Sequence, residues 1–242
     1  MALMKEIDMK KYIALLIILI ISMLSTAFAA LIDVSKYAFL DETLVFPDLQ
    51  TVVKDDRGRD VIDYVTEQKY YKYHYATNEI IKATAIGLIS GYQDGTFKPN
   101  ETITKGEFIK LAIGLAVNRN FDISAIPTNL KHWSAPYVAV AEMQNVVNVG
   151  EYNDFNLNEP ITRIEMICIL SKIQINMKGI SQYRDAELPN YTDIDTLTEE
   201  EKELLLHAAR YELIAGMFDT LTIRPYDNLT RGDAAMAIMR VY

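Results

Sequence analysis

Hydrophobic positions become regular about a third of the way along the chain, and their spacing predicts a series of helices. Apolar residues recur at about helical spacing between positions 80 and 89, and Gly91 marks the end of this first helix. A turn centred on Asp94-Gly95 follows, because this dipeptide favours tight turns. A second helix is predicted to begin at Thr104, with an apolar face formed by Phe108, Ile109, Leu111, Ala112 and Leu115.

The same order of helix, turn and helix occurs twice more along the chain. First helices are predicted from about Pro136 to Val147 and from about Thr198 to Ile214. The corresponding second helices begin at Thr162 and Thr230. The hydrophobic pattern therefore predicts three helix pairs.

Each second helix begins with a threonine, a cation and, two residues after the cation, an acid. The three motifs are Thr104-Lys105-Gly106-Glu107, Thr162-Arg163-Ile164-Glu165 and Thr230-Arg231-Gly232-Asp233. In such a capping box the threonine hydroxyl and the acid side chain each accept a backbone N–H at the helix start. A cation there faces the positive end of the helix dipole and is mildly unfavourable. The threonines are separated by 58 and then 68 residues, so the motifs form a long internal repeat.

These patterns predict a mainly α fold, in which three helix-turn-helix units pack as a pseudo-threefold helical bundle. One helix pair cannot bury its own apolar face, whereas three pairs around a common axis can. The predicted units are residues 46–120 with an insertion at about 49–73, residues 121–178 and residues 179–242. The insertion runs into a tyrosine-rich segment, residues 69–75, which either packs against a neighbouring unit or forms a partner surface.

The N-terminal residues are typical of an export signal. Lysines precede an apolar run at positions 13–24, and Ala27-Phe28-Ala29 provides an A-x-A cleavage site. Residues 1–29 are therefore predicted to be a signal peptide, with Met9 as an alternative start, and residues 30–45 an N-terminal segment. The competing interpretation is an uncleaved anchor, because residues 13–32 are just long enough to span a membrane.

Charge and residue types exclude several classes of function. The chain of 242 residues has a formal net charge of −9, which disfavours nucleic acid as a partner because phosphate is bound by cations. The single Cys168 allows no internal disulfide and is interpreted as a small buried hydrophobe. His74, His132 and His207 show no shared spacing and are interpreted as structural. No catalytic motif, metal site or cofactor site is predicted, so no enzyme activity is expected.

Specific stretches resemble a known family. Residues 87–108, GLISGYQDGTFKPNETITKGEF, are similar to the S-layer homology module, whose consensus ends in a T-R-A-E box. Residues 132–138, HWSAPYV, resemble the start of the first helix of such a unit. Tyr191-Thr192-Asp193 and Phe46-Pro47-Asp48 are similar to its F-x-D opening. Together with the capped motifs, the resemblance covers about residues 46–242.

The resemblance implies a secreted protein of the bacterial cell-wall surface, with grooves between its units. In this family the grooves bind secondary cell-wall polysaccharide, which often ends in a pyruvylated sugar whose acidic group meets the cation of the box. Such an anion would make the cation at the helix start favourable. The ligand-binding residues that the resemblance implies are Lys105, Arg163, Arg231, Asp48, Asp193, Gly91, Asp94, Gly95, Trp133, Gly216 and Asp219.

The units depart from the family pattern to different extents. The turn from Gly91 to Phe97 in the first unit is intact, whereas residues 149–155 of the second unit have lost the pattern. Lys105 and Arg231 are therefore expected to contact the glycan, and Arg163 to contribute little. The alternative hypothesis is a structural or assembly component of the surface layer that acts through contacts with other surface-layer proteins, with its glycan sites partly vestigial.

Overall fold

The computed structural model describes residues 46–52, 54, 57–59, 71–117, 122–181, 190–214 and 221–241. The chain divides into two units, residues 1–45 and 46–242, and every described residue belongs to the second. The predicted signal peptide and N-terminal segment lie outside the described residues. Among the described helices, none combines the length and apolar character needed to cross a membrane.

The described part of the chain is mainly helical, as predicted. Its α-helices are α3 (Thr77–Ala85), α4 (Lys105–Ala116), α5 (Ala135–Met143), α6 (Arg163–Lys172), α7 (Glu199–Arg210) and α8 (Arg231–Val241). Short 3₁₀ turns are η2 (Pro47–Leu49), η3 (Ile123–Ala125) and η4 (Asn156–Asn158), and a π-helical turn, η5 (Ile173–Met177), continues α6. Two three-residue strands, β1 (Gln50–Val52) and β2 (Tyr71–Tyr73), pair antiparallel at the two ends of the predicted insertion.

The second helices begin where the capping boxes predict. In α4 the N–H of Glu107 donates to Oγ1 of Thr104 at 3.2 Å, and the N–H of Thr104 donates to Glu107 at 2.9 Å. The same reciprocal bonds are present at the start of α6 and of α7. At the start of α8 the N–H of Asp233 donates to Oγ1 of Thr230 at 3.1 Å. Local side-chain chemistry therefore sets these four helix starts.

The first helices are shorter than predicted. The prediction that Gly91 ends the first of them is wrong, because α3 ends at Ala85. Gly87, Asn145 and Glu212, each two residues past a helix end, have positive φ angles of 71°, 53° and 58°. The next N–H in each case donates five residues back, to Ala83, Ala141 and Ala208, which is the Schellman termination. The sequence did not reveal it, because only one of the three left-handed residues is a glycine.

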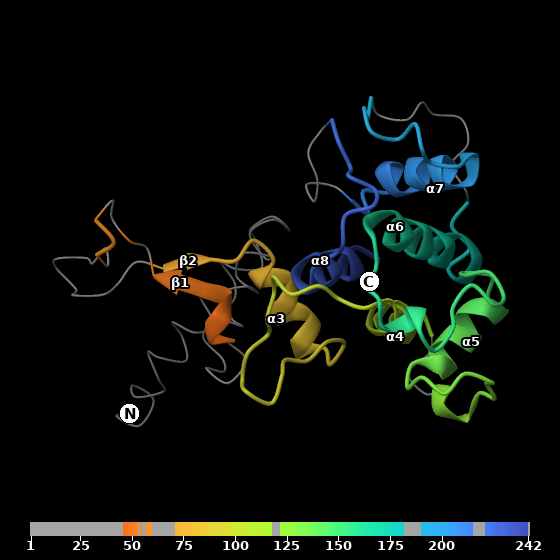
Figure 1. Cartoon of the computed structure of the whole chain (residues 1–242), viewed down its shortest axis with the longest axis horizontal. Coiled ribbons are helices and arrows are strands. Elements are labelled where there is room, and N and C mark those ends of the chain that lie inside the picture. The colour runs from red at the N-terminus through yellow and green to blue at the C-terminus, as the bar shows by residue number, and fades with distance from the viewer. Residues whose placement is uncertain are drawn as a thin grey trace, which may run out of the picture. The chain divides into compact units, whose positions relative to one another are not determined.

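Helices pack across the predicted units rather than within them. The second helix of one unit lies against the first helix of the next, so that α4 packs on α5 and α6 on α7. The last helix, α8, packs on the first, α3 (Figure 1). Buried apolar side chains from each of the six helices join one continuous core, which also contains Phe97 and Leu49.

Three extended stretches just before α4, α6 and α8 bond to one another in a closed ring. The N–H of Ile103 donates to Leu229, that of Leu229 to Ile161, and that of Ile161 to Ile103, at 3.1, 2.8 and 3.1 Å. Two residues on, the first N–H of α4, α6 and α8 donates to Glu159, Asp227 and Glu101 respectively. A helix start normally leaves its first N–H groups unsatisfied. Here the neighbouring unit accepts one, and each cation is thereby carried to the turn of a different unit.

Candidate functional site

Arg231, the first residue of α8, reaches the turn that follows α3. Its Nε donates to the carbonyl of Phe97 at 3.0 Å and its Nη2 to the carbonyl of Ser90 at 3.1 Å. The guanidinium lies over the rings of Tyr92 and Phe97, 4.7 and 4.8 Å from their centroids. The residue is only 7% exposed. The intact turn of the first unit is thus served by the cation of the third unit, and the prediction that pairs it with Lys105 is wrong.

The backbone of this turn is held by Asp48. Its carboxylate accepts from the N–H of Phe97 at 2.9 Å and from the N–H of Lys98 at 2.5 Å. Lys98 has a positive φ of 58°, which costs energy for a residue with a side chain. The carboxylate offsets that cost with two charge-assisted bonds.

Three further turn residues named by the sequence shape the loop. A Cβ on Gly91 would lie 2.2 Å from the ring of Phe46, so only glycine fits there. Asp94 accepts from the N–H and hydroxyl of Thr96, and these bonds lower the pKa of its carboxyl group. Gly95 has a φ of 81°, which glycine adopts freely.

Beside Arg231 lies a pocket of about 220 Å³, here called the Arg231 pocket. It is lined by Leu88, Ile89, Ser90, Gly91, Tyr92, Ile103, Glu107, Lys110, Leu111, Trp133 and Arg231. Trp133 is 54% exposed, and Nζ of Lys110 lies 5.7 Å from its ring centroid. The pocket therefore combines two cations and one carboxylate, that of Glu107, with an aromatic surface, and its net positive charge can bind an acidic ligand with apolar faces. Of the residues named by the sequence, it brings together Gly91, Trp133 and Arg231, whereas Asp48, Asp94 and Gly95 do not line it.

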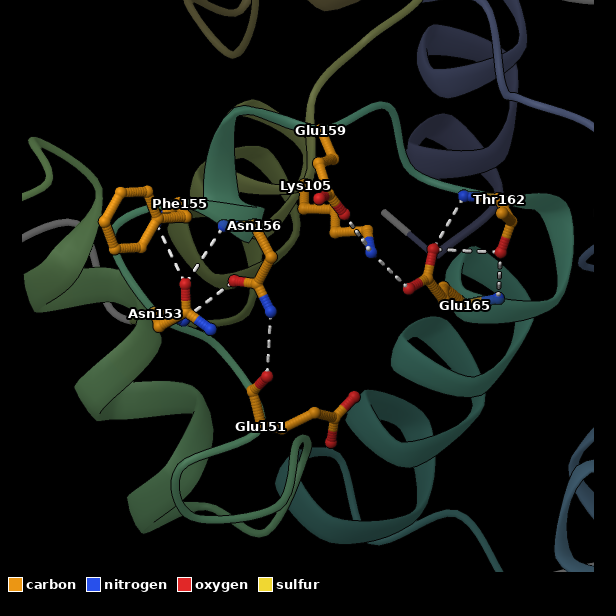
Figure 2. A network of polar contacts seen from close by, with 8 residues as sticks. All are labelled: Lys105, Glu151, Asn153, Phe155, Asn156, Glu159, Thr162 and Glu165. Carbon is orange, nitrogen blue, oxygen red and sulfur yellow. Dashed lines mark hydrogen bonds and ion pairs between the residues drawn. The ribbon is translucent and has the colours of Figure 1, made fainter.

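Lys105 lies in a different environment. Its Nζ is 3.0 Å from Glu165 and 3.4 Å from Glu159, so two carboxylates flank it (Figure 2). Burial alone would lower the pKa of Lys105, but the two carboxylates, Glu165 more than Glu159, outweigh it and raise that pKa. Lys105 is fully charged at neutral pH and already neutralised by the protein.

Arg163 occupies the corresponding position next to the third unit. Its Nη1 donates to the carbonyl of Ile223 at 3.3 Å and lies 3.9 Å from the carboxylate of Asp227. Burial, and then the charge of Arg224, lower the pKa of its guanidinium. Gly216 and Asp219, which the sequence assigns to this turn, lie outside the described residues.

Asp193 repeats the role of Asp48 in the third unit. It accepts from the N–H groups of Ile223 and Arg224 at 3.1 and 2.7 Å, and Arg224 is again left-handed with a φ of 48°. The two opening aspartates thus hold turns in place, and neither lines the Arg231 pocket.

The second unit has no opening aspartate and solves the same problem differently. Asp154, from the turn itself, accepts from the N–H groups of Lys131 and His132 at 2.7 and 2.8 Å. Asn153 accepts from the N–H groups of Phe155 and Asn156, which holds the chain in the 3₁₀ turn η4 (Figure 2). Phe155 is 87% exposed in consequence, although Phe97 and Ile223 at the equivalent positions are fully buried.

Sequence reasoning missed part of this arrangement. Lys110 and Tyr92 line the pocket, but a single lysine on the polar side of a helix carries no signal of its own. The statement that the histidines show no shared spacing is wrong, because His74 and His132 are separated by the same 58 residues as Thr104 and Thr162. Their rings lie 3.1 and 3.2 Å from the side chains of Asn100 and Asn158, so a repeat signal was present.

Other chemistry is sparse in the described part of the chain. No group of three or more histidine, cysteine or carboxylate side chains there could hold a metal ion. Burial raises the pKa of the Cys168 thiol to about 12, so it is not an activated nucleophile. In the tyrosine-rich segment, the hydroxyl of Tyr75 donates to Asp233 at 2.7 Å, and burial chiefly raises its pKa to about 12.

Two known proteins align with parts of this chain. The chain is 22% identical over 208 residues to an amylopullulanase of Thermoanaerobacterium thermosulfurigenes, and the alignment covers 84% of this chain and 10% of that protein. It is 33% identical over 85 residues to an uncharacterized cell wall amidase of Bacillus anthracis, which covers 34% of this chain and 16% of that protein. The chain thus spans a small fraction of each relative. Residues 70–109, which include α3, the turn that receives Arg231 and the start of α4, match the S-layer homology domain, and the chain carries one such domain there.

Proposed function

We propose that this protein is a non-catalytic module of the cell envelope that binds an acidic secondary cell-wall polysaccharide in the Arg231 pocket. The S-layer homology match at residues 70–109 supports this class of function. The names of the two relatives refer to enzymes, but the aligned stretches are 10% and 16% of those proteins. Their activities are therefore not transferred to this chain.

The observation that carries the proposal is the state of Arg231. Buried charges in proteins are usually paired with an opposite charge. Among the described residues, no carboxylate lies within ion-pairing distance of Arg231, which is held by two backbone carbonyls and two aromatic faces. A preorganised guanidinium without an acid partner favours a carboxylate-bearing ligand.

The rest of the pocket suits the end of a sugar chain. Its volume of about 220 Å³ is below the roughly 300–1,000 Å³ that holds drug-sized ligands, and it matches one terminal residue better than a polymer interior. Trp133 offers an exposed ring for the apolar face of a sugar, and Lys110 adds a second cation. A pyruvylated sugar, with one carboxylate on a compact ring, is the ligand we assign.

We further propose that residues 46–242 form three S-layer homology units in a pseudo-threefold bundle. Two observations support it: the ring of bonds among Ile103, Leu229 and Ile161, and the packing of each second helix on the next first helix. In this arrangement each groove takes its turn from one unit and its cation from another. The groove that contains the Arg231 pocket is the one to which we assign glycan binding.

The test is retention on purified cell-wall sacculi. We expect the protein to bind native sacculi and to be lost from sacculi stripped chemically of their secondary polymer. Arg231→Ala should reduce retention on native sacculi, and a protein-depleted wall should retain as much wild type as an untreated one. Equal retention on stripped and native sacculi would sink the proposal.

A role in protein assembly is the second candidate, because Phe155 and Val149 are almost fully exposed on the second unit. Isolated apolar side chains are common on soluble proteins, so this observation carries less weight. Light scattering after size-exclusion chromatography separates the two functions. A protein that stays monomeric, binds the polymer released from the sacculi and binds no surface-layer protein would exclude the assembly role.

A further inference from the structure

The cations of the three capping boxes differ in what they contact. Arg231 contacts backbone carbonyls and aromatic rings, with no carboxylate among its described partners. Lys105 stands at the same position of its helix, yet it contacts the carboxylates of Glu159 and Glu165 at 3.4 and 3.0 Å. Its side chain is 14% exposed. Two carboxylates of the protein therefore flank the Lys105 ammonium.

The cause lies in the turn that Lys105 faces. In the first unit, the buried ring and the carbonyl of Phe97 hold Arg231. In the second unit, Asn153 holds the chain so that Phe155 points outward, and Figure 2 shows this ring on the side of the turn away from Lys105. The counterpart of the Phe97 anchor is lost. Glu159, whose backbone carbonyl accepts the Lys105 N–H at 2.9 Å, also brings its carboxylate to 3.4 Å from Nζ of Lys105.

The adjacent surface is also acidic. A pocket of about 190 Å³ between the second and third units is lined by Glu151, Glu165, Glu200 and Glu201. Lys172 in this pocket pairs with Glu200 at 2.8 Å. Glu165 belongs to both places, because it lines this pocket and lies 3.0 Å from Nζ of Lys105. An anionic ligand near these carboxylates would be disfavoured, since like charges in close proximity cost free energy.

Building on the proposed function, we propose that the protein's own side chains close to glycan the surface around Lys105, Glu159 and Glu165, here called the Lys105 groove. The carboxylates of Glu159 and Glu165 occupy the position that the acidic group of a sugar would take. The chain consequently binds glycan in the Arg231 pocket and binds none in the Lys105 groove. Glu159 and Glu165 are specificity determinants, because they set the number of anionic sugars that one chain binds.

The inference can be tested by removing the two charges and counting sites. The variant is Glu159→Gln with Glu165→Gln, which keeps the capping box because glutamine also serves at its third helical position. The probe is a synthetic methyl glycoside that carries a cyclic pyruvate ketal, and calorimetry measures stoichiometry and Kd. Glu199→Gln is the matched control, since it removes an exposed glutamate that pairs with Lys202 at another capped helix start.

We expect one site in the wild type and in Glu199→Gln, and two sites in the doubly neutralised variant. Adding Lys105→Ala to that variant should remove the second site, with at least a tenfold loss of affinity there. A doubly neutralised protein that still binds one equivalent, or a second site indifferent to Lys105→Ala, overturns the inference.

The proposed function is tested separately, with the single variant Arg231→Ala in the wild-type background. If the wild type fails to bind the probe while the neutralised variant binds through Lys105, the assignment of the Arg231 pocket falls and the self-closed groove stands. Circular dichroism and thermal melts of every variant verify that each is folded under the conditions of the titration.

Discussion

Arg231 donates from Nε to the carbonyl of Phe97 at 3.0 Å, and these two residues are 134 positions apart in the sequence. The bond ties the first turn of α8 to the loop behind α3. A local reading of the chain assigns each cation to the turn in its own unit. The closed ring of backbone bonds shifts every cation to a neighbouring unit, and this shift makes Arg231, rather than Lys105, the first choice for mutation.

We expect Arg231→Ala to weaken glycan binding about 10- to 100-fold, because a charge-assisted contact of about 1.5–3 kcal/mol is lost. Arg231→Lys should retain part of the affinity, since it keeps the charge but not the fork geometry. Lys105→Ala should change binding less than threefold, because Glu159 and Glu165 already neutralise Lys105. Calorimetry with the pyruvylated glycoside checks all three. A larger loss from Lys105→Ala than from Arg231→Ala would show that the grooves are ranked wrongly.

Two glycines of α4 should respond in opposite directions to substitution by alanine. A Cβ on Gly106 would lie 2.7 Å from the ring of His132 and 2.8 Å from Oγ of Ser134, whereas a Cβ on Gly114 meets nothing within 4 Å. Gly106→Ala should therefore destabilise by about 1–3 kcal/mol through overpacking. Gly114→Ala should stabilise by about 0.5–1 kcal/mol through helix propensity. Urea denaturation measures both, and a shift of the same sign for the pair contradicts the packing argument.

Asp48→Asn and Asp193→Asn should separate turn support from ligand contact. Each removes a charged acceptor from two backbone N–H groups, so each should lower the free energy of unfolding by about 1–3 kcal/mol. Only Asp48→Asn should also weaken glycan binding, because only its turn receives Arg231. Thermal melts and calorimetry on the same samples provide both quantities. Equal losses of affinity in the two variants would indicate that Asp193 also supports a glycan site.

His207 should make stability fall on mild acidification. Its side chain is fully buried, its Nε2 lies 3.0 Å from Oε1 of Gln174, and burial lowers its pKa. Below pH of about 6.5 the unfolded chain takes up a proton that the folded protein binds only at lower pH, so the free energy of unfolding decreases as pH falls from about 6.5 toward the lowered pKa.

The measurement for His207 is a set of urea unfolding curves between pH 7.5 and pH 5, comparing wild type with His207→Gln. The glutamine variant has no group that titrates at this position, so its stability should change less over the interval, whatever its absolute value. Identical pH slopes in the two proteins would assign the acid sensitivity to other groups.

The sequence predicted most of what depends on neighbouring residues. The starts of α4, α6, α7 and α8 follow from Thr-x-x-acid motifs, because a capping box needs only four consecutive residues. The ends of α3, α5 and α7 were placed too late, since Asn145 and Glu212 adopt left-handed backbone that their residue types do not advertise.

The candidate site was predictable in residue type but not in grouping. Trp133, Gly91 and Arg231 were all named from the resemblance, yet they come from three different units. Phe97 and Phe155 align with each other, but one is fully buried and the other 87% exposed. Asp48, which is 49 positions away, accepts the N–H of Phe97, whereas Asn153, two residues away, accepts the N–H of Phe155, so the aligned rings have different backbone partners.

Assembly of the Arg231 pocket is coupled to completion of the fold. The loop behind α3 is synthesised long before α8, and the entropy of closing so long a segment is offset only when α8 docks on α3. Under the proposed function, the chain would hold its polymer only after the ring has closed. Mass action works in the other direction as well. Free polymer end groups at 100 times Kd would add about 2.7 kcal/mol to the stability of the closed form. The wall polymer would then retain molecules whose ring has closed, whereas incompletely folded molecules would diffuse away.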